Sequence, residues 1–264
     1  MRVCFWTVLL LCSFPALAAP PVGQWIWTRE DRRVFSESQK ALPELRAAPW
    51  VSTLTVERGA VVQHLAQQPE VAGVPARMLL VRFDDRVAGL FDTLDDATLA
   101  AQVDARLRAL LDAVARAGAS PAEVQLDFDC PVRLLPRYAT LVKALGQGAL
   151  RGREVWLTSL YAHVQAAAYG ELFRGLVAGH ILQLFDTGDG LRPSQAEEVV
   201  RAVERQGLPF QLGLGAFERH RGGRGTHHRA WFSARPVFER SPLYRGLWIF
   251  PGGQRWLPLV EEKP

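Results

Sequence analysis

Two aspartates on one face of a short alternating segment are the residues of this chain best placed to do chemistry. Residues 123–129 read EVQLDFD, so Gln125, Asp127 and Asp129 point to one side and apolar residues to the other, as in a β-strand. On a strand, the Cα atoms of Asp127 and Asp129 lie about 6.6 Å apart. Like charges this close should raise the pKa of one carboxyl, giving a proton donor beside an ionised partner. The alternative is that one aspartate caps the next helix and the other binds Arg82.

The position of this strand determines whether its acids can be tolerated. The strand lies between two helical segments, so we expect both of its faces to be covered. Burying an ionised carboxylate without a partner is costly. A closed parallel barrel removes the conflict, because the strands end at a solvated mouth, where barrel enzymes hold their catalytic groups.

The ends of the other expected strands bring polar and aromatic side chains to the same mouth. Carboxyls can act at a glycosidic bond, and flat rings stack on the C–H surface of a sugar, so this combination favours a saccharide ligand. In the enzymatic hypothesis Asp129 is the acid, and Asp127 or Asp186 is the charge stabiliser or base. For Asp84 and Asp186 the alternative is a turn or helix-start residue. The side chains that we expect to bind substrate are Trp27, Arg82, Asp84, Gln125, Thr158, Tyr161, Gln183 and Trp248.

The remaining reactive side chains do not form a recognisable second site. Cys130 has no histidine at a spacing typical of nucleophile activation. His220, His227 and His228 lack helical i, i+4 spacing and cysteine partners, so we expect no metal and no cofactor. These histidines lie in an Arg/Gly-rich loop at 218–235. We interpret that loop either as a solvated insertion or as a cationic lid that attracts an anionic ligand.

Strands and helices alternate along the chain. The expected helices span 95–117, 134–145, 166–176 and 195–206, the last with Ser194 as N-cap and Glu197 completing a capping box. Residues 36–45 could be a weak helix or a loop, and 60–72 are ambiguous. The expected strands span 24–27, 50–56, 76–83, 123–129, 154–160, 180–185, 210–216 and 246–250.

Alternating strands and helices predict βαβ units and a parallel sheet. Eight such strands in about 245 residues fit a single (β/α)8 barrel, which makes 19–264 one α/β domain. A doubly wound open sheet is the alternative, but the sequence has no Gly-x-Gly-x-x-Gly turn and no phosphate-binding loop.

Composition and charge narrow the classes of partner. With 48% hydrophobic and 22% charged residues, the chain is typical of a globular protein. Its formal charge of +4 comes mostly from scattered arginines and not from a dense basic helix, so we expect no nucleic-acid partner. We expect a monomer that binds a carbohydrate or another small polar ligand at the mouth.

The first 18 residues are typical of a secretory signal peptide. Arg2 precedes an apolar run, and Ala16-Leu17-Ala18 forms a small-x-small cleavage site, with cleavage after Ala18 or Ala19. The apolar run is too short for a membrane span. We do not expect lipoprotein anchoring at Cys12, because the preceding Leu11 is not small. The protein is therefore expected to be exported, either periplasmic or extracellular.

Several segments together resemble a family of secreted bacterial proteins known as domain of unknown function 3142. The resemblance rests on VQLDFD at 124–129, YATL at 138–141, WLTSL at 156–160 and LQLFD at 182–186. It covers most of the chain after the signal peptide. It implies a glycoside-hydrolase-like barrel without an established substrate.

The strand with Asp127 and Asp129 is also similar, more distantly, to the Asp-x-Asp-x-Glu strand of chitinase-type hydrolases. In that family the final Glu is the acid, and a neighbouring Asp orients the N-acetyl group of the substrate. Here Pro131 stands where that Glu would follow Asp129. Either the register moves by two and Asp129 is the terminal acid, or the chitinase mechanism is absent. A non-catalytic saccharide-binding protein and a structural envelope protein whose own loop fills the mouth are therefore the competing hypotheses.

Overall fold

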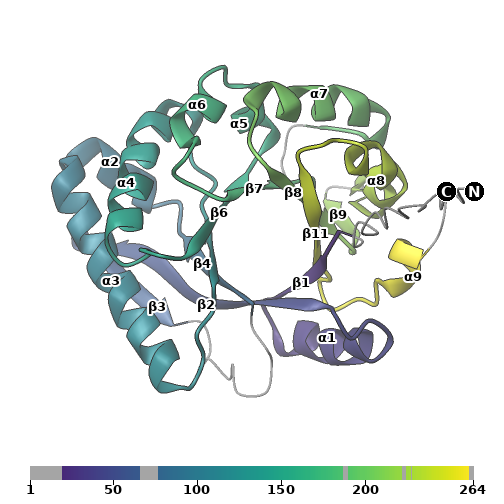
Figure 1. The fold of residues 1–264 in the computed structure, drawn as a ribbon, viewed down its shortest axis with the longest axis horizontal. Coiled ribbons are helices and arrows are strands. Elements are labelled where there is room, and N and C mark those ends of the chain that lie inside the picture. The colour runs from purple at the N-terminus through teal and green to yellow at the C-terminus, as the bar shows by residue number, and fades with distance from the viewer. Residues whose placement is uncertain (1–19, 66–76, 187–189, 222–223, 227, 262–264) are drawn as a thin grey trace, which may run out of the picture.

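Eight parallel strands close into a barrel with helices around its outside (Figure 1). The computed structural model describes residues 20–65, 77–186, 190–221, 224–226 and 228–261. The strands follow chain order around the barrel, and β11 pairs with β1 to close it. The predicted (β/α)8 barrel is confirmed, and the open doubly wound sheet is wrong. The barrel strands are β1 (Val22–Ile26), β2 (Arg46–Glu57), β4 (Met78–Phe83), β5 (Glu123–Asp127), β6 (Glu154–Ser159), β7 (Gly179–Gln183), β8 (Phe210–Gly215) and β11 (Tyr244–Phe250).

A further strand, β3 (Ala60–Leu65), lies antiparallel to the second half of β2. Arg58 and Gly59 both have positive φ, 51° and 77°, which suits the tight turn between two antiparallel strands. Strand β2 pairs with β1 through its first residues and with β3 through its last, so β3 lengthens the barrel wall on that side. The ambiguous segment at 60–72 therefore begins as a strand, and its residues from 66 onward lie outside the described part.

The helices bury apolar stripes against the outer face of the barrel. In α3, Leu99, Val103 and Leu107 are buried, and the side chain of Asp95 accepts a hydrogen bond from the backbone of Thr98 at 2.8 Å, so this predicted helix is confirmed. Among the described helices, none combines the length and the apolar character needed to cross a bilayer. The helices are α1 (Arg29–Ala41), α2 (Val87–Thr93), α3 (Asp96–Arg116), α4 (Leu135–Gln147), α5 (Tyr161–Gln165), α6 (Tyr169–Phe173), α7 (Ala196–Gln206), α8 (Trp231–Glu239) and α9 (Leu257–Glu261).

The single helix predicted at 166–176 is wrong, because two short helices, α5 and α6, replace it. A side chain at Gly170 would collide with the carbonyl oxygen of Gln206, so α6 packs directly on the end of α7. The side chain of Gln206 accepts from Gly170 N at 2.8 Å and donates to Val164 O at 2.6 Å. These bonds satisfy backbone groups where the chain leaves α5 and enters α6.

Three other local predictions also need correction. Helix α1 begins well before residue 36, because Thr28 and Asp31 form a capping box at its start. Ser194 lies inside a short 3-10 turn, Pro193–Gln195, and makes no cap; α7 begins at Ala196 without a side-chain cap. The region 218–235 is not one loop, because it contains the hairpin β9 (Arg219–Arg221) and β10 (Arg224–Thr226) and the start of α8.

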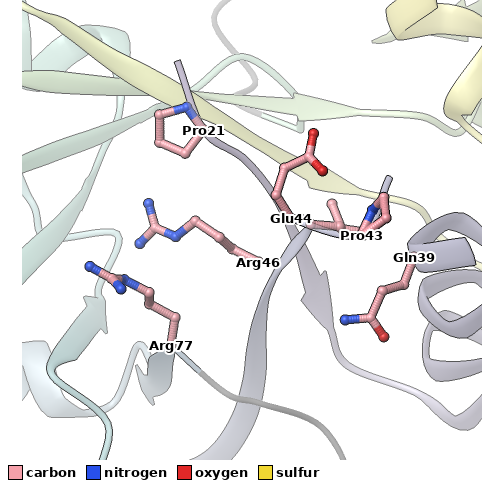
Figure 2. A pocket seen from close by; sticks show the side chains of 7 residues that line it. Pro21, Gln39, Pro43, Glu44, Arg46 and Arg77 are labelled. Carbon is pink, nitrogen blue, oxygen red and sulfur yellow. The ribbon is translucent and has the colours of Figure 1, made fainter. Parts of the chain in front are cut away.

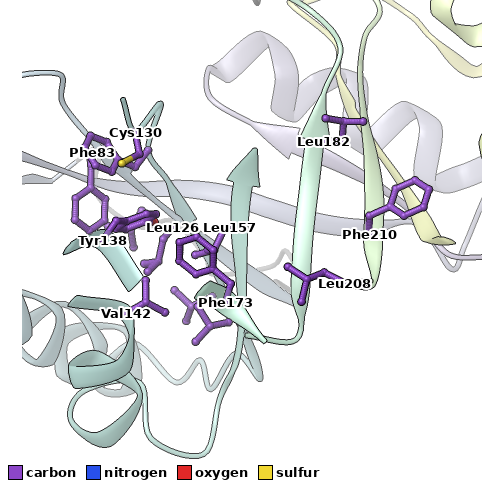
Figure 3. Close-up of a cluster of buried hydrophobic side chains, with 14 of the residues drawn as sticks. Phe83, Leu126, Cys130, Tyr138, Val142, Leu157, Phe173, Leu182, Leu208 and Phe210 are labelled. Atoms are coloured by element: carbon purple, nitrogen blue, oxygen red, sulfur yellow. The ribbon is translucent and has the colours of Figure 1, made fainter. Parts of the chain in front are cut away.

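The interior of the protein consists of two apolar layers. Residues between the strands and the helices form the larger layer, in which Phe83, Tyr138 and Phe173 pack together (Figure 3). A second cluster, which includes Trp25, Leu80 and Trp156 among others, fills the inside of the barrel. The barrel is therefore a packed core with room for chemistry only at its ends.

A buried aspartate ties the first strand to the last segment of the chain. Asp31 accepts hydrogen bonds from the backbone of Trp27, Thr28 and Gly253, at 3.1, 3.0 and 2.9 Å. Gln24, on β1, donates to the carbonyl of Asp31 and accepts from the indole of Trp256, both at 2.7 Å. These bonds hold the closing edge of the barrel together.

Candidate functional site

A cavity of about 260 Å³ opens at the C-terminal ends of the barrel strands, and we call it the mouth cavity. Asp127 and Gln183 are the last residues of their strands, and Asp129 and Asp186 follow shortly after. Of the residues expected at the mouth, the cavity brings together Trp27, Arg82, Gln125, Asp127, Asp129, Gln183 and Asp186.

A chain of hydrogen bonds runs from Trp25 to Asp127, and each residue in it donates to the next. The indole of Trp25 donates to Gln125 Oε1 at 2.7 Å, so the amide nitrogen of Gln125 is the group that donates to Thr158 Oγ1, at 2.8 Å. The hydroxyl of Thr158 then donates its own hydrogen to Asp127 Oδ1, at 2.6 Å. Because Oδ1 is an acceptor, a proton on Asp127 would sit on Oδ2.

The surroundings of Asp127 favour its protonated form. Burial raises its pKa from 3.8 to about 6; the hydrogen bond from Thr158 and the charge of Arg82 act against this rise, and the charge of Asp129 adds to it. The pKa of Asp129 is also raised, because its carboxyl is partly removed from water at the mouth; Arg82 opposes this effect and Asp85 adds to it. The charge of Asp129 therefore contributes to the raised pKa of Asp127, but burial is the larger cause.

Aromatic rings form one wall of the mouth cavity. The half-buried ring of Trp27 lies 5.0 Å from Trp50 and 6.1 Å from Phe250, measured between ring centroids. The guanidinium of Arg82 lies 5.8 Å from the ring of Trp27, a cation–π distance. Arg82 is thus held between an aromatic surface and the two acids, and the wall offers flat rings to a ligand.

Asp186 contributes a third carboxyl to the mouth cavity. Its φ of 52° is in the left-handed region, which aspartate tolerates better than most residues. One carboxyl oxygen lies 3.4 Å from Nε2 of the buried His228. Gln183 donates to the carbonyl of Phe185 at 2.9 Å, which orders the backbone just before Asp186.

A buried histidine, His163, stabilises the turn that contains Asp129. Cys130 N donates to Phe128 O at 2.7 Å, which makes a tight turn just after β5. His163 Nδ1 accepts from Leu160 N at 3.1 Å, so its proton is on Nε2, which donates to the carbonyl of Cys130 at 2.6 Å. Burial lowers the pKa of His163, which keeps the imidazole neutral in this role.

The other residues expected to bind substrate are not part of the cavity lining. Asp84 accepts from Arg86 N at 3.0 Å in a turn, which was its alternative interpretation. Thr158 donates its hydrogen bond to Asp127, which does line the cavity. Tyr161 donates to Glu198 between α5 and α7, at 3.0 Å. Trp248 is almost fully buried inside the barrel, where it stacks on Trp25 and donates to Gln211.

Cys130 is not suited to act as a nucleophile. Its side chain is buried, and burial raises the pKa of the thiol to about 12, so the thiolate is not populated near neutral pH. Of the three loop histidines, only the side chain of His228 belongs to the described part of the chain, where it lies against Phe217 and Phe185.

Four residues of the cavity lining were missed, and alternation along the strands could have found two of them. Trp25 and Leu80 lie two residues before Trp27 and Arg82, so they share the inward face one layer deeper. Phe185 and Phe250 lie at or just beyond the ends of β7 and β11, where the sequence does not define the direction of a side chain.

Solved structures with this fold include glycoside hydrolases. The spore cortex-lytic enzyme SleL of Bacillus cereus superposes with a TM-score of 0.62 and 13% identity, over 92% of this chain and 74% of SleL. The family 18 chitinase of Crocus vernus gives 0.57 and 8%, over 91% and 95%. A chitinase of Rhizomucor miehei gives 0.56 and 9%, over 86% and 93%.

The chain therefore has the TIM-barrel fold of these hydrolases, and its distant similarity to chitinase-type enzymes is confirmed at the level of the fold. Neither a family model nor a curated protein sequence matches it. At such low identities the likeness concerns the fold alone, and the chemistry has to be argued from the mouth cavity.

Proposed function

We propose that this protein hydrolyses a polysaccharide or glycan in the mouth cavity, with Asp127 and Asp129 as its pair of carboxyls. The observation that carries this proposal is Asp127, whose pKa is raised to about 6 beside a second carboxyl in a cavity lined by aromatic rings. Supporting it, the fold is shared with enzymes described as chitinases and as a spore cortex-lytic enzyme.

The two carboxyls have different roles because they differ in exposure to solvent. Asp129 is exposed at the rim, so it is the group that reaches the glycosidic oxygen as the acid. Asp127 lies deeper and keeps a proton in the pair up to about pH 6, while its Oδ1 is held by Thr158. Asp186, which also lines the cavity, is the candidate for stabilising positive charge on the sugar ring.

The lining residues position the sugar. Trp27 offers its ring to the C–H face of a pyranose, and Arg82 and Gln183 can hydrogen-bond its hydroxyls. The cavity of about 260 Å³ falls slightly below the range of roughly 300–1,000 Å³ typical of ligand pockets. A terminal sugar or a short stretch of chain therefore fits it better than a long segment.

Substituting Asp129 tests the proposal. Asp129→Asn should reduce polysaccharide hydrolysis by at least a hundredfold, the lower end of general-acid contributions. The melting temperature should stay unchanged, because the side chain is exposed. Hydrolysis is measured by release of reducing ends from a panel of polysaccharides. Asp112→Asn is the matched control, since Asp112 is an exposed acid on α3 and lies outside the cavity lining. Full activity of Asp129→Asn would remove this residue from the mechanism.

A non-catalytic saccharide-binding protein is the second candidate, favoured by Pro131 in the place of the chitinase glutamate. In that case no polysaccharide of the panel is cleaved, and a glycan array detects binding to the wild type. Trp27→Ala should abolish that binding, since it removes the half-buried ring that lines the cavity. Binding that persists in Trp27→Ala would place the sugar elsewhere.

We also propose that the protein is exported by residues 1–18, which lie outside the described part of the chain, and that it acts as a monomer. Export is supported by the basic start, the apolar run and the small-x-small site of the sequence. N-terminal sequencing of the exported protein should begin at Ala19 or Pro20.

A further inference from the structure

We infer that the opposite end of the barrel binds a small oxyanion, a carboxylate or a phosphate. A second cavity, of about 420 Å³, lies at the N-terminal ends of the strands, and we call it the basal cavity. It takes Arg46 from β2, Glu123 from β5, Trp156 from β6 and Arg245 from β11, together with Arg77 just before β4. This inference does not depend on the proposed function, because the mouth cavity shares none of these residues.

Charges at the basal cavity favour an anion. Arg46 and Arg77 both bind Glu123, at 2.5 and 3.0 Å, so that carboxylate is already neutralised by two guanidinium groups. Glu154 is the other acid in the lining, and Arg245 is a third arginine. The lining of the basal cavity therefore holds three guanidinium groups and two carboxylates.

Two buried donors in the same lining have no hydrogen-bond partner among the described residues. These are Nε1 of Trp156, whose residue is 6% exposed, and Nε of Arg46, whose side chain is 14% exposed. Arg46 also stacks at 5.2 Å on the ring of Trp248, which fixes the plane of its guanidinium. A buried donor without an acceptor costs free energy, so an acceptor at this place would stabilise the protein.

The approach to the basal cavity is open on one side. Arg46 and Arg77 also line an adjoining depression of about 470 Å³, where Figure 2 shows their guanidinium groups extending to the same side, away from Gln39. The side chain of Arg77 is 63% exposed, and its bond to Glu123 uses only Nε. Its terminal nitrogens can therefore meet an incoming anion, as arginine commonly does with carboxylate and phosphate.

Titration of the full-length protein with phosphate and with acetate, each exchanged against chloride at constant ionic strength, tests the inference. Calorimetry should show saturable binding of at least one anion and a matching rise in melting temperature. Preference for phosphate would identify a phosphoryl ligand, and preference for acetate a carboxylate. No saturable binding of either would mean that ordinary water satisfies these donors, and would overturn the inference.

Two substitutions localise the binding. Trp156→Phe removes the indole N–H and keeps an aromatic ring, and Arg77→Gln removes one exposed guanidinium; each should raise the dissociation constant roughly tenfold. Arg33→Gln on α1 is the control, since Arg33 is a similarly exposed, ion-paired arginine outside the lining of the basal cavity and of the adjoining depression. Arg77→Gln remains informative if Trp156→Phe fails to fold. Wild-type affinity in Arg77→Gln would refute the site, and Asp129→Asn should bind the anion like the wild type.

Discussion

At the scale of single residues, Asp127 shows how burial can keep one carboxyl of a pair protonated. Its two inward neighbours in sequence, Gln125 and Asp129, were visible from the alternation of β5. The donor chain from Trp25 through Gln125 and Thr158 was not, because those partners come from other strands. The hydrogen bond from Thr158 opposes the effect of burial, yet the pKa still rises to about 6, so burial is the larger effect.

The raised pKa of Asp127 predicts how the stability of the protein changes with pH. The folded protein binds the proton of Asp127 more tightly than the unfolded chain does. Below about pH 4 this carboxyl therefore does not lower the free energy of unfolding. As the pH rises through about 6, its ionisation lowers that free energy. Near pH 8 the cost is at most about 3 kcal/mol. Asp127→Asn, which keeps an acceptor for Thr158, should therefore be more stable than the wild type at pH 8 and lose this advantage at pH 4.

Urea unfolding of both proteins at the two pH values measures this difference. Carboxyls that lie away from the mouth cavity titrate alike in the two proteins, so their contributions cancel. Asp92→Asn is a suitable control, because the pKa of Asp92 is lowered by its hydrogen bonds from Arg133, and this variant should lose stability at pH 8 if it changes at all. An advantage of Asp127→Asn that is equal at both pH values would contradict the proposed protonation.

At the scale of elements, the end of β5 depends on a helix that follows a different strand. Asp129 is exposed, but the backbone immediately after it is held by His163 of α5. The sequence places these residues 34 apart, and only the pairing of β5 with β6 brings α5 behind the turn. The position of the acid therefore relies on a residue outside the mouth cavity.

Substitution of His163 should change both stability and the site. His163→Leu leaves the carbonyl of Cys130 and the N–H of Leu160 without partners, which should cost about 2 kcal/mol or more and reduce hydrolysis. His163→Gln can still accept from one group and donate to the other, so it should recover much of both. The pKa of Asp129, followed by NMR, should change in His163→Leu and stay near the wild-type value in His163→Gln.

His64→Gln is the matched control for these variants, since His64 is exposed and its contact with Glu57 lies on the surface. It should change stability by less than about 0.5 kcal/mol. If His163→Leu kept wild-type hydrolysis and the wild-type pKa of Asp129, the histidine would support only the fold and not the position of the acid.

At the scale of the whole molecule, the barrel closes through the buried carboxylate of Asp31. This side chain joins the end of β1 to the segment after β11, more than two hundred residues away, through Gly253. Gln24 and Trp256 make a second bridge across the same edge. Closure depends on these bonds as well as on the pairing of β1 with β11.

Asp31→Asn should weaken this closure. Asp31 accepts hydrogen bonds on both carboxyl oxygens, whereas an amide has only one oxygen that can accept. At least one buried backbone N–H therefore loses its charged partner. The free energy of unfolding should fall by about 2–4 kcal/mol. Urea unfolding measures the loss, with Glu30→Gln as the exposed neighbouring control. A loss no larger than that of Glu30→Gln would show that strand pairing alone closes the barrel.

Much of the architecture and part of the site could be predicted from the local pattern. Alternation indicated a strand at 123–129, but β5 ends at Asp127, and Asp129 lies in the turn that follows. The rule that parallel strands end at one mouth placed Arg82 and Gln183 at the cavity that both acids line. The helix at 166–176 could not be predicted correctly, because Gln206 binds the backbone of Gly170 across two elements. Trp248 was expected at the mouth, but it fills the barrel interior below it.

The sequence by itself determined which face of each strand is polar, because side chains alternate along a strand whatever surrounds it. That was enough to propose a barrel whose mouth holds Asp127 and Asp129. Only the tertiary structure decided how deep each side chain lies, and therefore that Asp127 is the buried carboxyl and Asp129 the exposed one. Depth depends on the stagger between neighbouring strands and on partners such as Thr158 and His163, and neither is encoded in the local spacing of residues.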